Sequence, residues 1–73
     1  MRRAYRSKLL RDACVAKGWT PADVVRAAHG LGHRITLSSV TRHLSGDAMP
    51  NARTLGLYAD VLHLPTDAFY EYT

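Results

Sequence analysis

The chain has few cysteines, prolines and aromatic residues, and it has no long hydrophobic run. A single cysteine, Cys14, excludes an internal disulfide framework and favours a cytoplasmic setting. No apolar stretch approaches the ~20 residues of a membrane-spanning helix. No signal-peptide core follows the basic first residues, so we expect no membrane association. A length of 73 residues allows one domain with one small core.

The sequence also lacks the groupings of residues that carry out catalysis or bind metal ions. It has no Cys-x-x-Cys pair, no glycine loop of the phosphate-binding type, and no pair of neighbouring carboxylates. His29 and His33 are four residues apart, but Gly30 and Gly32 argue against a shared helical face. We therefore expect no enzymatic activity, no metal site, no cofactor and no small-molecule ligand.

Acidic residues are scarce over most of the chain, and the charges are unevenly distributed. Residues 1–53 hold all ten Lys and Arg residues against three Asp residues, whereas residues 54–73 hold three acidic residues and no Lys or Arg. The formal net charge is +4. This distribution favours a polyanionic partner at one end of the molecule, although a solvated basic surface without a partner would have the same composition.

Glycine and proline divide the chain into short segments with helical spacing, and no segment has the alternation of a strand. We expect helices over about 5–17, from the cap Thr20 to about residue 28, from Thr36 to Gly46, and from the cap Asn51 to Pro65, with a last turn over 66–70. Residues 29–34 are expected to form a loop. The expected fold is all-α and compact, with five helices and one domain: a basic arm (1–6), a helical core (7–70) and a tail (71–73). Phe69 is expected to pack on the core.

The most informative segment covers residues 36–46, Thr-Leu-Ser-Ser-Val-Thr-Arg-His-Leu-Ser-Gly. Thr36 fits a helix N-cap and Gly46 a helix stop, with Ile35 and Val40 as a possible hydrophobic staple. Val40 and Leu44 lie on one face, and small polar and basic side chains cover most of the remaining surface. In a chain this basic, we expect that surface to contact nucleic acid.

Four segments together carry a family resemblance. They are Lys-Gly-Trp-Thr-Pro-Ala-Asp-Val-Val, Ile-Thr-Leu-Ser-Ser-Val-Thr-Arg-His-Leu-Ser-Gly, Pro-Asn-Ala-Arg-Thr-Leu and Ala-Asp-Val-Leu-His-Leu-Pro. Their order and spacing, over residues 8 to about 70, resemble the lambda-repressor-like family of phage repressors, Cro proteins and small bacterial regulators. The resemblance implies a five-helix, helix-turn-helix domain in the cytoplasm of a bacterial or phage-infected cell. It also implies a Cro-like transcriptional regulator or small repressor that binds double-stranded DNA sequence-specifically, with residues 36–45 in the major groove.

The resemblance further implies roles by position. The expected base-reading residues are Leu37, Ser38, Thr41 and Arg42, with His43 close by. The expected phosphate contacts are Thr36, Ser39, Asn51, Arg53 and Arg34. A bidentate Arg42 suits guanine, and Arg53 stands in the first turn of its helix, where the helix dipole disfavours a cation. Arg2, Arg3 and Arg6 are expected either to form a basic arm that follows DNA or enters a minor groove, or to be a disordered start.

The sequence departs from the family in three places. The turn between the second and third helices is several residues longer, and the side chains at 37–39 are shorter than the amides common in relatives. Cys14 and Leu44 occupy positions where many relatives hold a buried ion pair, and we expect these two apolar side chains to touch.

The aromatic tail suggests a contact between two copies of the chain. Phe69, Tyr70 and Tyr72 are the candidate residues, and a homodimer on a palindromic operator is expected, although a frayed terminus is the alternative. A protein-interaction module of the same fold, such as an antitoxin or adaptor, is the main alternative function. Non-specific coating of nucleic acid is a third.

Overall fold

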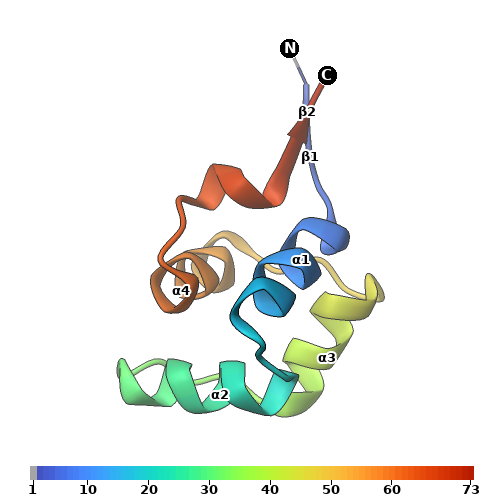
Figure 1. Ribbon diagram of the computed structural model, residues 1–73. Helices are drawn as coiled ribbons and strands as arrows, with labels where there is room; N and C mark the ends of the chain where they lie inside the picture. The colour runs from blue at the N-terminus through green and yellow to red at the C-terminus, as the bar shows by residue number, and fades with distance from the viewer. Residues whose placement is uncertain (1) are drawn as a thin grey trace.

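The order of elements follows the signals for helix starts and stops in the sequence. The computed structural model describes residues 2–73, and Met1 of the expected arm lies outside them. Four α-helices, α1 (Ser7–Lys17), α2 (Pro21–Gly30), α3 (Leu37–Ser45) and α4 (Ala52–Leu62), precede a short 3-10 helix, η1 (Thr66–Phe69). Two strands, β1 (Arg3–Tyr5) and β2 (Tyr70–Tyr72), lie near the chain ends (Figure 1). The result is a compact, mostly helical domain with a small two-stranded sheet.

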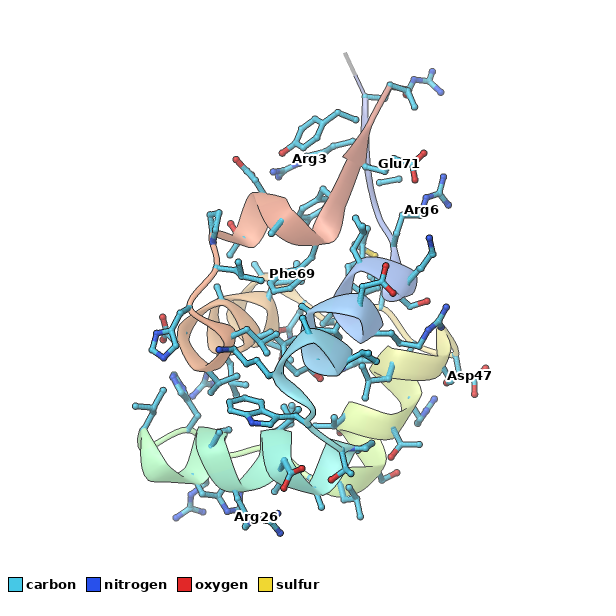
Figure 2. All side chains as sticks on the ribbon, in the orientation of Figure 1. Arg3, Arg6, Arg26, Asp47, Phe69 and Glu71 are labelled. Atoms are coloured by element: carbon cyan, nitrogen blue, oxygen red, sulfur yellow. The ribbon has the colours of Figure 1, made fainter. Side chains whose placement is uncertain are left out.

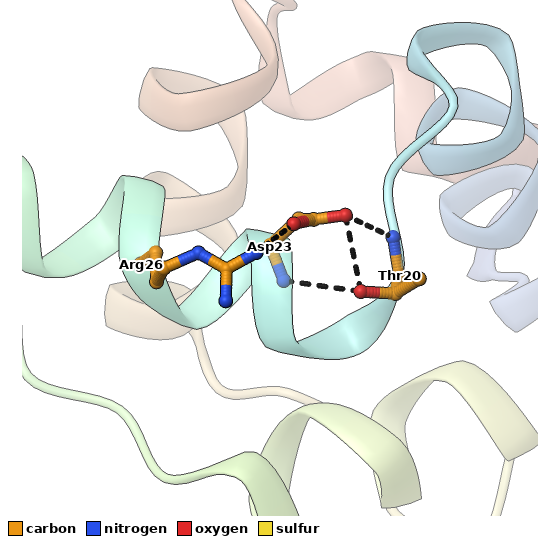
Figure 3. A network of polar contacts seen from close by, with 3 residues as sticks. All are labelled: Thr20, Asp23 and Arg26. Carbon is orange, nitrogen blue, oxygen red and sulfur yellow. Dashed lines mark hydrogen bonds and ion pairs between the residues drawn. The ribbon is translucent and has the colours of Figure 1, made fainter.

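Side-chain caps set the starts of three helices. At α2 the Thr20 hydroxyl accepts a bond from the Asp23 amide at 3.3 Å, while the Asp23 carboxylate accepts one from the Thr20 amide at 2.8 Å (Figure 3). These two bonds form a capping box, which an ion pair between Asp23 and Arg26 extends. Thr36 caps α3 and Asn51 caps α4, as predicted. Local hydrogen bonds therefore determine where these helices begin.

Three helix limits differ from the predictions. The first helix begins at Ser7 rather than Tyr5, because residues 3–5 belong to a strand. Helix α2 continues through Gly30, so the connection to α3 begins at Leu31 rather than at residue 29. Helix α4 ends at Leu62, where His63 adopts a left-handed conformation with φ 55° ahead of Pro65.

The prediction that the chain contains no strand is wrong. Strands β1 and β2 pair antiparallel, with Arg3 opposite Tyr72 and Tyr5 opposite Tyr70. Backbone bonds between Arg2 and Thr73 extend the pairing at 3.0 and 2.9 Å. Figure 1 shows this ribbon at the end of the molecule opposite α2. Residues 2–6 are therefore not a detached arm, because the C-terminal tail supplies hydrogen-bond partners for their backbone.

The core lies between the four helices and η1. Its buried hydrophobic residues are Leu10, Cys14, Val24, Ala28, Val40, Leu55, Leu57, Tyr58, Val61, Leu62 and Phe69. Phe69 is completely buried, as predicted, and Trp19 packs against the cluster while partly exposed. Leu44 also packs against this cluster, and Arg11 donates to its carbonyl oxygen at 2.9 Å, which links α1 to α3. A direct contact between Leu44 and Cys14 stays a prediction.

Candidate functional site

Helix α3 is amphipathic, and its inner face differs from the predicted one. Val40 is fully buried and His43 is 9% exposed, whereas Leu44 is only partly buried. His43 was expected near the base-reading side chains, and this placement is wrong. His43 lies on the buried face of α3, where its ring nitrogen Nδ1 forms a hydrogen bond with the Tyr58 hydroxyl in the core.

The outer face of α3 carries the four residues expected to read bases. Leu37, Ser38, Thr41 and Arg42 are all exposed, with 52% of the Leu37 residue accessible. The Thr41 hydroxyl donates to the Leu37 carbonyl oxygen at 2.9 Å, so its hydrogen is already engaged within the helix. The side chains of Ser38 and Arg42 are four residues apart and share one side of α3. This side presents hydrogen-bonding groups to any partner that approaches it.

Two tyrosines hold His43 in place. Its Nδ1 lies 2.6 Å from the Tyr58 hydroxyl, and the two rings pack edge to face with centroids 5.7 Å apart. The Tyr5 hydroxyl donates to the His43 carbonyl oxygen at 3.2 Å, which joins β1 to α3. Burial raises the pKa of Tyr5 to about 12 and raises the pKa of Tyr58. Burial, with a smaller effect from nearby Arg42, lowers the pKa of His43, so the ring is neutral near pH 7.

Two adjoining hollows lie beside α3, and they contain the residues expected to contact phosphate. The first, of about 820 Å³, is bounded by the 32–36 connection, α3 and α4, and its lining includes Arg34, Thr36 and Ser39. The second, of about 910 Å³, includes Arg34, Asn51 and Arg53. Arg34 borders both hollows. The fold thus gathers on one side of the molecule five residues that are separated by up to 19 positions in the chain.

The arginines on this side differ from most of the other basic residues in having no acidic partner. Within residues 2–73, Arg34, Arg42 and Arg53 are exposed and form no ion pair. By contrast, Arg26 pairs with Asp23, and Lys8 lies 4.0 Å from Asp12. Three guanidinium groups therefore remain available for an anionic partner.

The arginines of the expected arm are held by the C-terminal segment. The Arg3 guanidinium lies 3.9 Å from the Asp67 carboxylate and 4.6 Å from the centre of the Tyr70 ring. Arg6 lies 3.5 Å from the Glu71 carboxylate (Figure 2). Both residues therefore lie along the paired chain ends rather than on a detached or disordered arm, and their contact with DNA stays a prediction.

One of the three residues predicted to form a contact between two copies of the chain is not accessible. Phe69 is completely buried beneath the ribbon and is therefore removed from the set of possible contacts. Tyr70 is partly covered by Arg3, whereas Tyr72 is 44% exposed. Only the two tyrosines of β2 remain accessible to a partner.

Three further findings concern metal binding, the single thiol and membrane-spanning helices. No group of three or more His, Cys, Asp or Glu side chains in residues 2–73 is arranged to hold a metal ion. Cys14 is 4% exposed, and burial raises the pKa of its thiol. Over the same residues, each helix is too short or too polar to cross a bilayer.

Comparison of the chain with protein-family models, curated proteins and solved structures found no match. The assignment of function therefore depends on the geometry and the charges described above.

Proposed function

We propose that the protein binds double-stranded DNA sequence-specifically and regulates transcription. In this proposal α2 and α3 act as a helix-turn-helix of the lambda-repressor-like kind, and α3 enters the major groove. The supporting observation is the outer face of α3, where exposed Leu37, Ser38, Thr41 and Arg42 stand on a helix whose opposite face is anchored by Val40 and His43. A helix anchored in this way presents a rigid set of side chains to base edges.

Arg42 has the central part in reading sequence. Its guanidinium is exposed and unpaired in the described residues, and its planar fork matches the O6 and N7 acceptors of guanine. Ser38, one turn earlier, suits a base edge or a phosphate oxygen. Leu37 offers only apolar contact, as with a thymine methyl group.

The two hollows beside α3 suit the sugar–phosphate backbone. Arg53 is exposed and unpaired in the first turn of α4, where the helix dipole disfavours a cation. A neighbouring phosphate would account for an arginine at that position. Arg34, Thr36, Ser39 and Asn51 border the same hollows, so a backbone that runs past them meets donors from three segments of the chain.

Two copies of the protein are part of this proposal. Each would place α3 in one of two successive major grooves, about 34–36 Å apart along a palindromic operator. The two tyrosines of β2, the half-buried Tyr70 and the exposed Tyr72, are the proposed contact between the copies.

The test begins with selection of preferred duplexes from a random pool, followed by affinity measurements on the selected site and on single-base variants. Arg42→Ala is expected to reduce discrimination at one base pair by about 1–3 kcal/mol. Arg53→Ala is expected to weaken binding to all duplexes about equally and to reduce the salt dependence by about one phosphate contact. Arg26→Ala is the matched control, because Arg26 is an exposed arginine already paired with Asp23.

Unchanged relative affinities in Arg42→Ala would contradict the base-reading assignment. Equal losses in Arg26→Ala and Arg53→Ala would indicate attraction by net charge alone. Failure to bind any duplex would favour the alternative of a protein-interaction module.

A further inference from the structure

One residue that lines the first hollow carries a hydrogen-bonding group without a partner among residues 2–73. His43 lines this hollow although only 9% of the residue is exposed. Its Nδ1 is engaged with the Tyr58 hydroxyl, whereas its Nε2 forms no hydrogen bond with any of the residues 2–73. Within those residues no fully buried side-chain nitrogen or oxygen lacks a partner, so Nε2 is not fully enclosed. Because His43 lines the hollow, its unpaired ring nitrogen is available to a ligand there.

The Tyr58 hydroxyl determines whether Nε2 of His43 donates or accepts a hydrogen bond. Tyr58 is completely buried, and among the described residues its hydroxyl is within hydrogen-bonding distance of the His43 ring alone. A buried phenol hydrogen requires an acceptor, so Tyr58 donates to Nδ1. In a neutral imidazole the proton then resides on Nε2, which makes that nitrogen a donor toward the hollow.

Other donors surround the same space. The Thr36 hydroxyl donates to the Ser39 oxygen at 3.0 Å, which leaves the hydrogen of the Ser39 hydroxyl available. Thr54 and Arg34 also line the hollow, and within residues 2–73 their side chains bond to no other protein group. No carboxylate is among the lining residues. The set contains donors and positive charge, which is the complement of an oxyanion.

We propose that this hollow, bounded by Arg34, Ser39, His43 and Thr54, binds a phosphate group. Its volume of about 820 Å³ falls in the range of small-molecule sites, about 300–1,000 Å³, so it has room for a phosphate ester as well as for a bare phosphate. The phosphate belongs either to a small free ester or to a nucleic-acid backbone. The free ester does not require the proposed function, whereas the backbone phosphate rests on it. If both hold, a free phosphate ester competes with DNA, because Arg34 and Ser39 serve both ligands.

Amide NMR spectra during titration with inorganic phosphate provide the test, with sodium chloride at equal ionic strength as the salt control. Saturable shifts are expected at Gly32, Ser39 and Thr54, together with a shift of the His43 Nε2 resonance in long-range ring spectra. Arg34→Gln is expected to weaken phosphate binding about tenfold, the size of one charge-assisted hydrogen bond. Arg26→Gln, which removes an exposed arginine outside the hollow, is expected to leave binding unchanged.

A parallel titration with a short DNA duplex identifies the source of the phosphate. Saturable shifts with inorganic phosphate that Arg34→Gln weakens support the free ligand. Shifts confined to the duplex titration and centred on the hollow support a backbone phosphate. Two results would overturn the site. The first is that the phosphate shifts do not saturate and the residues of the hollow also do not respond to the duplex. The second is that the ring spectra locate the proton on Nδ1. Duplex binding detected elsewhere on α3 would in that case leave DNA binding by this helix intact and would remove only the backbone contacts assigned to the hollow.

Discussion

Replacing Tyr58 with phenylalanine tests whether the polar contact beneath α3 stabilises the fold. The ring is completely buried and the change removes one oxygen atom, so the packing of the core is retained. The loss is the 2.6 Å bond to His43 Nδ1, which leaves a largely buried ring nitrogen without a partner. A net hydrogen bond contributes about 0.5–1.5 kcal/mol, and an unsatisfied buried group costs about 1–3 kcal/mol. We expect Tyr58→Phe to lower the free energy of unfolding by about 1–3 kcal/mol.

Thermal and urea unfolding monitored by circular dichroism measure this change. For a domain of this size each 1 kcal/mol lowers Tm by roughly 4–8 °C, so the shift is readily detected. Tyr72→Phe is the control, because Tyr72 is 44% exposed and its hydroxyl has no hydrogen-bond partner among residues 2–73; its effect is expected to stay within about 0.5 kcal/mol. Equal stability of Tyr58→Phe and the unmodified protein would refute the structural role of the His43 contact.

Three further predictions concern pH, backbone strain and thiol reactivity. Burial lowers the pKa of His43 below its ordinary value of 6.5, so the unfolded chain binds a proton at a higher pH than the folded protein. The contribution of neutral His43 to the free energy of unfolding should be complete above about pH 6.5 and should decline as the pH falls from there through the folded-state pKa. Midpoints of urea unfolding at pH 7.5 and 5.5 measure this decline, and equal midpoints would contradict it. Gly46→Ala should lower the free energy of unfolding more than Gly18→Ala in the same assay. Both glycines have positive φ, but of the two only Gly46 would place an added Cβ 3.1 Å from the Ser7 hydroxyl oxygen. Equal losses in the two variants would exclude that close contact as a cause. Cys14 should react with a thiol reagent at pH 8 far more slowly in the native protein than in urea, because the thiol is buried and its pKa is raised; equal rates would argue against its place in the core.

The starts of α2, α3 and α4 could be predicted from the sequence because side-chain caps within the first turn determine them. Thr20 and Asp23 are three residues apart and form their capping box without help from the rest of the fold. Thr36 and Gly46 delimit α3 in the same way, through a side-chain cap and a left-handed stop. The spacing of Val40 on this helix also indicated which side is buried. Each of these features depends on residues within one or two turns of one another.

The pairing of the chain ends and the inner face of α3 were decided only by tertiary structure. Residues 3–5 form a strand because residues 70–72 lie beside them, and each segment is only three residues long, too short for alternation to indicate a strand. His43 turns inward because Tyr58, 15 positions away, supplies a hydrogen bond within the core. The hollow beside α3 likewise requires Arg34 and Thr54, from separate segments of the chain, to line the same space. The sequence by itself determined the helices and their exposed arginines, whereas contacts between distant residues decided which side chains face one another, because such contacts exist only after the chain has folded.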